Sequence, residues 1–352
     1  MNMTKSKLDR FQKAKFFAII LLSLNGRIIY AQAMPNEEST MQFYGLIGTY
    51  ASKSKISSQS SVPFRMQSGG LTTSYFGIAG HEYIGSGNKI IFSFESFFRP
   101  TIGEAGRNAT DAFFQRNAYV GFSNNAYGTF KFGQQTNQTY VNQTMLNPFG
   151  SSVVFSPLIV ASYTAAYSPI QIGDTVWART IGYFSPPIGG ISGAIQYSTS
   201  DGSSSSHDNI GVHLIYKNGS FQAALSAQRV RGAVAMPGTE QYLYLGGATY
   251  DAKFAKFYGA LQTTNNKTAR ARSHTYELGL SVPVTTTSSI LTEWARTKKN
   301  SPIAPNNTRN TISLGYDYSL SKRSDIYVVY MTDKLTGNTR GNTLAVGFQH
   351  KF

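Results

Sequence analysis

The chain has 352 residues, no cysteine, 41% hydrophobic residues and a formal net charge of +15. Without cysteine it has no disulfide framework, and beyond the N-terminal region no apolar run is long enough for a transmembrane helix, so a bundle of membrane-spanning helices is excluded. The basic residues are spread along the chain, with no basic helix and no RNA-recognition motif, which argues against nucleic acid as a partner.

The first 33 residues have the form of a secretory signal. Basic residues precede the apolar run Phe16 to Leu24, and Ala31-Gln32-Ala33 has the small-x-small form of a cleavage site, although Arg27 between them departs from the pattern. The segment holds six of the 32 Lys and Arg residues, so the rest of the chain is still basic. We therefore predict a signal peptide over residues 1–33 and an exported membrane domain over residues 34–352.

The rest of the chain repeats a two-residue period. Apolar residues alternate with small or polar ones in segments of about ten residues, the length that a tilted strand needs to cross the hydrocarbon layer of a membrane. Clear examples are Ile210 to Tyr216, Tyr276 to Val282, Ile312 to Tyr318 and Leu344 to Phe352. Two segments, Gln241 to Tyr250 and Ser324 to Met331, carry apolar residues on both parities. About sixteen candidate strands predict an all-β protein, an antiparallel transmembrane β-barrel.

Short and long connections alternate along the chain. Short turns such as Asp251-Ala252 interleave with longer polar stretches such as Thr263 to Ser273. In outer-membrane barrels the short turns face the periplasm and the long loops face the outside. Both chain ends are therefore expected in the periplasm, which requires an even number of strands.

One connection, Gln135 to Asp174, stands apart from the others because it is about forty residues long. A loop of this length in a compact protein is usually functional or disordered, and its many aromatic and aliphatic residues argue against disorder. The sequence Asn147-Pro148-Phe149-Gly150 marks a turn near its middle. We expect this apolar loop to pack against the inner wall of its own barrel.

Several stretches resemble the general porins of Gram-negative bacteria, most closely those of the beta-proteobacterial and neisserial type. They are MQFYGLIGTY at residues 41–50, SYFGIAGHEYIGSGNKIIFSFES at 74–96, RNAYVGFSNNAYGTFKFGQQ at 116–135, LGYDYSLSKRSDIYVVY at 314–330 and TLAVGFQHKF at 343–352. The resemblance covers essentially the whole chain after the signal. It implies a sixteen-stranded trimeric barrel in the outer membrane whose third loop folds into the lumen and forms a constriction. That loop corresponds to residues 135–174, with Asn147, Pro148, Phe149 and Gly150 at its turn.

Porins of this family set arginines on the wall opposite carboxylates of the inserted loop, and this sequence departs from that arrangement. Arg116 stands where the family has a wall arginine, but Tyr75 replaces the corresponding arginine of the second strand. No Asp or Glu occurs from Ala112 to Gly173. Strict alternation puts Arg116 on the lipid-facing parity of Ala118 and Val120, whereas the resemblance puts it in the lumen, and both orientations stay open.

Other charged residues are expected to face the lumen. Lys89 and Glu95 lie on the parity opposite to Phe92 and Phe94, and a basic residue on the lipid face costs about 2–4 kcal/mol at the membrane midplane. Either the two residues act directly on permeation, or they form an ion pair on the wall that matters little for transport. The candidate pore-lining residues are Tyr75, Lys89, Glu95, Arg116 and Lys131.

No motif indicates an enzyme. The chain lacks a GxSxG nucleophile elbow, a glycine-rich phosphate loop and histidines at metal-ligand spacing. The run Asp201 to Asp208 brings serine, histidine and aspartate close together, but a polar serine run between strands is typical of a loop tip. We predict no catalytic, cofactor-binding or metal site, and a barrel hydrolase is the least favoured alternative.

These features predict a general diffusion porin, a water-filled channel for small hydrophilic solutes and ions. Because the inserted loop offers no carboxylate while Lys131 leaves positive charge near the constriction, we expect weak selectivity or a preference for anions. A substrate-specific channel for sugars or anions is the alternative. The expected partners are two further copies of the chain, outer-membrane lipids including lipopolysaccharide, and the outer-membrane assembly machinery. Phe352, an aromatic of the lipid-facing parity at the chain end, resembles the signal that this machinery reads.

Overall fold

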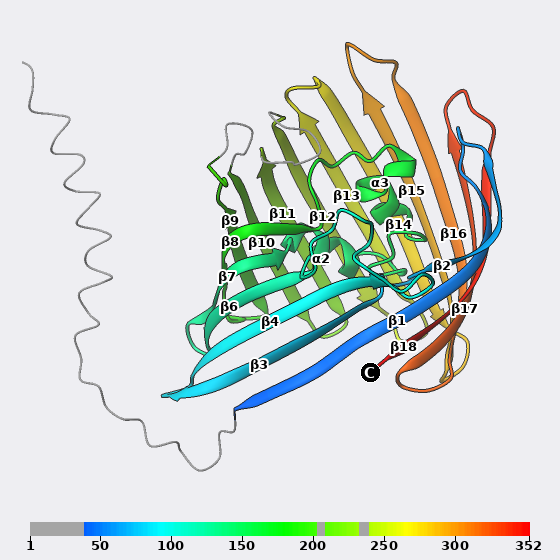
Figure 1. Cartoon of the computed structure of the whole chain (residues 1–352). Helices are drawn as coiled ribbons and strands as arrows, with labels where there is room; N and C mark the ends of the chain where they lie inside the picture. Colours follow the sequence, from blue (N-terminus) through cyan, green and yellow to red (C-terminus); the bar gives the residue numbers. More distant parts are fainter. Residues whose placement is uncertain (1–38, 203–207, 232–238) are drawn as a thin grey trace, which may run out of the picture. The chain divides into compact units, whose positions relative to one another are not determined.

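The computed structural model of the protein describes residues 39–202, 208–231 and 239–352, so the signal peptide predicted over residues 1–33 lies outside the described residues. Neighbouring strands pair antiparallel, and the sheet closes on itself because the first strand pairs with the last (Figure 1). The strands are β1 (Thr40–Lys55), β2 (Ser61–Ser68), β3 (Tyr75–Gly85), β4 (Asn88–Arg99), β5 (Glu104–Ala105), β6 (Asn117–Asn124), β7 (Gly128–Thr136), β8 (Val176–Phe184), β9 (Ile191–Ser198), β10 (Asn209–Asn218), β11 (Phe221–Val230), β12 (Gln241–Asp251), β13 (Lys256–Asn266), β14 (Ala271–Pro283), β15 (Ser288–Asn300), β16 (Asn307–Ser319), β17 (Ser324–Leu335) and β18 (Gly341–Lys351).

Strands β2 and β3 occupy one position in the wall, because the first half of β1 pairs with β3 and its second half pairs with β2. Residues 69–74 interrupt this position, and Gly69 and Gly70 have positive φ there. The Ser74 hydroxyl accepts a hydrogen bond from the N–H of Gly48 at 2.9 Å and donates to its carbonyl at 3.1 Å, so the buried backbone keeps its partners. The two-residue β5 pairs with the end of β4, outside the wall. The described residues therefore form a barrel of sixteen strand positions, as the sequence predicts.

The two-residue period places apolar side chains on the outside of this barrel. In β18, Leu344, Val346 and Phe348 are 54%, 55% and 43% exposed, whereas the residues between them are buried. Exposed apolar rows of this kind are stable when they face lipid. We call this side of the wall the outer face and the opposite side the inner face.

The two strands with apolar residues on both parities, β12 and β17, lie beneath the long segment between β7 and β8. Tyr327, Val329 and Met331 of β17 belong to the inner row and are at most 2% exposed, because they pack in clusters with residues of that segment. Leu243 and Leu245 of β12 pack against the same segment. A barrel strand needs apolar residues on its inner face only where protein covers it, so the mixed periodicity marks the strands that the segment contacts.

The connection between β13 and β14 is shorter than the sequence suggests. Thr263 to Ser273 was expected to be a loop because it is polar, but β13 continues to Asn266 and β14 begins at Ala271. The prediction was wrong because backbone pairing does not require apolar side chains, so the strands extend beyond their apolar rows.

The segment of residues 137–175 between β7 and β8 contains α2 (Gln138–Met145), α3 (Pro157–Tyr163) and the 3-10 helix η2 (Ala165–Tyr167). The side chain of Asn137 caps α2 by accepting a hydrogen bond from the N–H of Thr139, and that of Ser156 caps α3 in the same way. Helix α2 lies against β10 and β11, whereas α3 lies against β14, β15 and β16 (Figure 1). Among the described residues, no helix is both long and apolar enough to cross a membrane.

Candidate channel constriction

Amide and hydroxyl groups of the inner face hold the first helix of segment 137–175. Asn137 and Thr139 donate to the same side-chain oxygen of Gln228 on β11, at 3.1 and 2.7 Å. Three residues after Thr139, Asn142 donates to the hydroxyl of Ser226 at 2.9 Å. Buried polar groups keep a fixed position when each has such a partner, so α2 is attached to β11.

A carboxylate of the wall caps the second helix. Glu293 of β15 is almost fully buried, and its Oε1 accepts hydrogen bonds from the N–H of Leu158 at 2.8 Å and from the hydroxyl of Ser156 at 3.0 Å. Negative charge is favourable at a helix N-terminus. Sequence reasoning missed Glu293, although it belongs to the inner row of β15 with Leu291 and Ala295.

The predicted turn at Asn147 to Gly150 is present. The side-chain amide of Asn147 donates to the carbonyls of Gln143 and Gly150, both at 2.9 Å. Gly150 has a φ of 57°, in the left-handed region that glycine tolerates best.

The same turn lies close to the wall at two glycines of the inner face. A Cβ added to Gly279 of β14 would lie 2.6 Å from Cδ of Pro148, and one added to Gly315 of β16 would lie 2.9 Å from Cε1 of Phe149. Phe149 is buried in one cluster with Tyr327. The segment that starts at β7 therefore contacts β14, β16 and β17.

Arg116 contacts the inner face. Its guanidinium forms an ion pair with the buried Glu95, and its Cζ lies 3.9 Å from the ring centroid of Tyr75. Tyr44 and Asn117 also donate hydrogen bonds to the Glu95 carboxylate. The lipid-facing orientation that strict alternation gives Arg116 is wrong. Strand β6 begins at Asn117, so the residue before it does not follow the pleat of the strand.

The two candidate lysines lie apart from each other. Lys131 of β7 places its Nζ over two aromatic rings, at 4.6 and 4.8 Å from their centroids. Lys89 lies over the ring of Tyr83 at 4.4 Å, beside the turn between β3 and β4. The interpretation of Lys89 and Glu95 as a wall ion pair is wrong, because Glu95 pairs with Arg116.

Arg107, in the connection between β4 and β6, ties that connection to the end of segment 137–175. Its Nε donates to Asp111 at 2.7 Å, and its two terminal nitrogens donate to the two oxygens of Asp174, both at 2.7 Å. Burial raises the pKa of Asp174, but the hydrogen bond and the charge of Arg107 outweigh burial and hold this pKa below its ordinary value. Burial likewise lowers the pKa of Arg107, while hydrogen bonds to the two carboxylates raise it overall.

A second buried ion pair, between Arg309 of β16 and Asp333 of β17, was missed by sequence reasoning. Asp333 also accepts a hydrogen bond from the N–H of Ser57 at 3.0 Å, which ties the first long connection to the wall. The sequence does indicate that Arg309 faces inward, because it has the parity of the inner row that contains Thr311 and Ser313. In the described part of the chain, no group of three or more His, Cys, Asp or Glu side chains could hold a metal ion.

Comparisons with known proteins agree with this architecture. Residues 29–338 match the family described as Gram-negative porin, so the chain belongs to this family, as its sequence motifs predict. It is similar to outer membrane porin protein 32 of Delftia acidovorans, with 25% identity over 308 residues that cover 85% of each chain. The protein is thus a porin of the outer membrane.

Two solved structures show the same fold. An anion-selective porin from Comamonas acidovorans superposes with a TM-score of 0.74 at 24% identity, over 90% of this chain and 100% of that one. OmpT of Vibrio cholerae, solved in a trimer form, superposes with a TM-score of 0.67 at 11% identity, over 90% of this chain and 100% of that one.

Proposed function

We propose that this porin is a general diffusion channel that segment 137–175 narrows and that prefers anions weakly. The contacts of the segment support the narrowing. Its first helix is bound to Gln228 on β11, and its turn packs at Gly315 on β16, far along the wall from the strands β7 and β8 between which it begins and ends. A segment fixed to the inner face at such separated strands reduces the cross-section that solutes and ions can use.

The distribution of charge supports the preference for anions. The acidic side chains on or beside segment 137–175 either form ion pairs or are covered by protein. They are Glu95, Asp174, Glu277, Glu293 and Asp333. Lys131 forms no ion pair with any of the described residues. Positive charge in a low-dielectric pore favours anions, and the Comamonas relative is described as anion-selective.

Single-channel conductance with ion substitution tests this proposal. Replacing chloride by a bulky anion while potassium is kept should lower the conductance more than replacing potassium by a bulky cation while chloride is kept. A larger effect of the cation would contradict the anion preference, and the absence of stable channels would contradict the porin function. A substrate-specific channel would instead show block of the KCl current by one solute at concentrations at which similar solutes have no effect.

Exposed aromatic residues of the outer face support assembly as a homotrimer. The rings of Phe43, Phe76, Phe113 and Phe114 form a continuous row, with neighbouring centroids 6.2, 6.1 and 4.8 Å apart. Phe113 and Phe114 belong to the connection between β4 and β6 and are 54% and 42% exposed. An exposed apolar patch that continues into a connection is typical of a protein interface, and the Vibrio relative has a trimer form.

The proposed partners also include lipopolysaccharide among the surrounding lipids and the assembly machinery that would read Phe352. The ring of Phe352 lies 5.6 Å from that of Phe43, at the end of the aromatic row. Small hydrophilic solutes and ions are the proposed cargo.

A further inference from the structure

A basic cluster lies on the outer face where β13, β14 and β15 extend beyond their apolar rows toward the long connections. Its members are Lys267, Arg270, Arg272, Arg296 and Lys298. The register of β14 and β15 shows the change from apolar to basic. In order toward the connections, the cross-strand pairs of the outer face are Leu278–Trp294, Tyr276–Arg296, His274–Lys298 and Arg272–Asn300. The channel function uses none of these basic residues, because they have the parity that faces away from the inner face.

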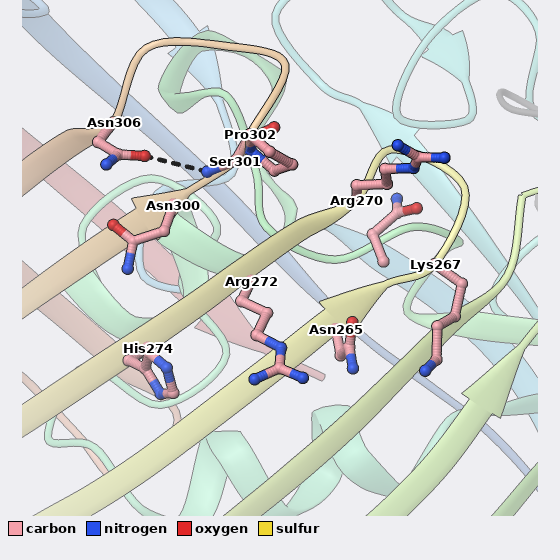
Figure 2. Close-up of a pocket in the computed structure, with 10 residues that line it drawn as sticks. Asn265, Lys267, Arg270, Arg272, His274, Asn300, Ser301, Pro302 and Asn306 are labelled. Atoms are coloured by element: carbon pink, nitrogen blue, oxygen red, sulfur yellow. Dashed lines mark hydrogen bonds between the residues drawn. The ribbon is translucent and has the colours of Figure 1, made fainter.

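The cluster surrounds an open cavity of about 690 Å³. Figure 2 shows the guanidinium of Arg272 between Asn265 and His274, with Lys267 and Arg270 at the connection of β13 and β14. Lys267, Arg270 and Arg272 thus line one space that is open to the surroundings, together with the amide of Asn265.

No acidic side chain of the described residues forms an ion pair with this cluster. Between Lys267 and Asn306 the sequence contains two acids, Glu277 and Glu293, and both are buried on the inner face. None of the cations of the cluster takes part in an ion pair among the described residues. Glu240, at the edge of the cluster, accepts a hydrogen bond from Tyr242. Like charges on neighbouring strand positions repel, so an anion that binds among them relieves this repulsion.

We propose that the cluster binds the phosphate groups of a phosphorylated lipid headgroup in the outer leaflet, the anionic part of lipopolysaccharide. The proposal rests on the proposed function, since a porin directs its long connections outward. A guanidinium recognises phosphate with paired hydrogen bonds, and basic residues just beyond an apolar row lie at the depth of the headgroups. The apolar pair Leu278 and Trp294 below the cluster fits the acyl chains of a lipid, which a free phosphate ion lacks.

Binding of lipopolysaccharide to the purified protein in detergent, measured by native mass spectrometry and by fluorescence titration, tests the site. The variant Arg272→Gln/Lys298→Gln should lower the apparent affinity by at least about tenfold. The control Lys322→Gln/Arg323→Gln removes the same charge from the turn between β16 and β17, at the opposite end of the strands, and should bind as the wild type does. If the strand variant does not fold, Lys267→Gln/Arg270→Gln changes only the connection of β13 and β14 and should give a similar loss.

Three results would overturn the proposal: equal affinity of the variant and the wild type, equal binding of dephosphorylated lipopolysaccharide, and displacement of the lipid by inorganic phosphate at millimolar concentration. Single-channel conductance is measured on the same preparations. Because the cluster is on the outer face, the conductance of the variant should equal that of the wild type. If the wild type forms no channels, the proposed function is wrong, whereas the binding measurement still decides whether the cluster binds lipopolysaccharide.

Discussion

Arg116 and Glu95 neutralise each other on the inner face, so replacing either one alone should change the ion preference of the channel. We expect Arg116→Gln to leave the carboxylate of Glu95 without its cation and to shift the zero-current potential toward cations, and Glu95→Gln to shift it toward anions. The double variant should return close to the wild type. Equal potentials for all four proteins would mean that the pair lies outside the path of the ions.

Asp174 gives the protein a stability that depends on pH. Its pKa is lowered in the folded protein, so its contribution is fully present above the ordinary value of 3.8 and is lost as the pH falls through the lowered pKa. We expect Asp174→Asn to melt below the wild type at neutral pH, with a difference that shrinks in acid. Thermal melts by circular dichroism from about pH 7 to about pH 2 check this. Arg107→Gln is the matched variant, and a difference that does not depend on pH would contradict the assignment.

At the element scale, α3 depends on the carboxylate of Glu293. Glu293→Ala leaves the buried N–H of Leu158 without its acceptor, which should lower the free energy of unfolding by about 1–3 kcal/mol and increase the noise of the open-channel current, because the segment is less firmly attached. Glu293→Gln keeps an oxygen that can accept the same bond and should have a smaller effect. Planar-bilayer recordings of both variants decide the point, and identical noise in the two would argue against the capping role.

The strands could be predicted from the sequence where one face meets lipid. In β16 and β18 the apolar row is exposed on the outer face, so lipid enforces the two-residue period. The interruption between β2 and β3 is marked locally only by the pair Gly69-Gly70, and it also depends on a tertiary contact, because a Cβ at Gly70 would collide with the hydroxyl of Tyr327, which is remote in sequence.

The candidate site could likewise be predicted from the sequence only where the signal is local. Local turn chemistry gave the turn at Asn147 to Gly150. The cap of α3 joins Leu158 to Glu293, 135 residues apart, and a single sequence carries no signal for a bond of that range. The orientation of Arg116 was left open because it depends on where β6 begins, and strand ends are not fixed by periodicity.

At the scale of the whole molecule, the C-terminal residue completes the closed wall. The backbone of Phe352 exchanges two hydrogen bonds of 3.1 Å with Gly45, and its ring packs near Phe43 at the edge of the proposed trimer interface. We expect deletion of Phe352, or Phe352→Asp, to lower the yield of heat-modifiable trimer from outer membranes at low expression, while Phe352→Trp, which keeps an aromatic ring, retains it. Unheated and boiled samples on a denaturing gel show the result, and an unchanged trimer yield after deletion would make the residue incidental.

The central claim is that the acids of the inner face beside segment 137–175 are neutralised or covered, so that unpaired positive charge, above all at Lys131, determines the preference of the channel. The zero-current potential of the wild-type protein across a planar bilayer under a KCl gradient tests this claim most directly. The potential should have the sign of a weak preference for chloride, and it should move toward zero in Lys131→Gln. A strong preference for potassium would contradict the account, because exposed acids would then have to line the narrowest part of the channel.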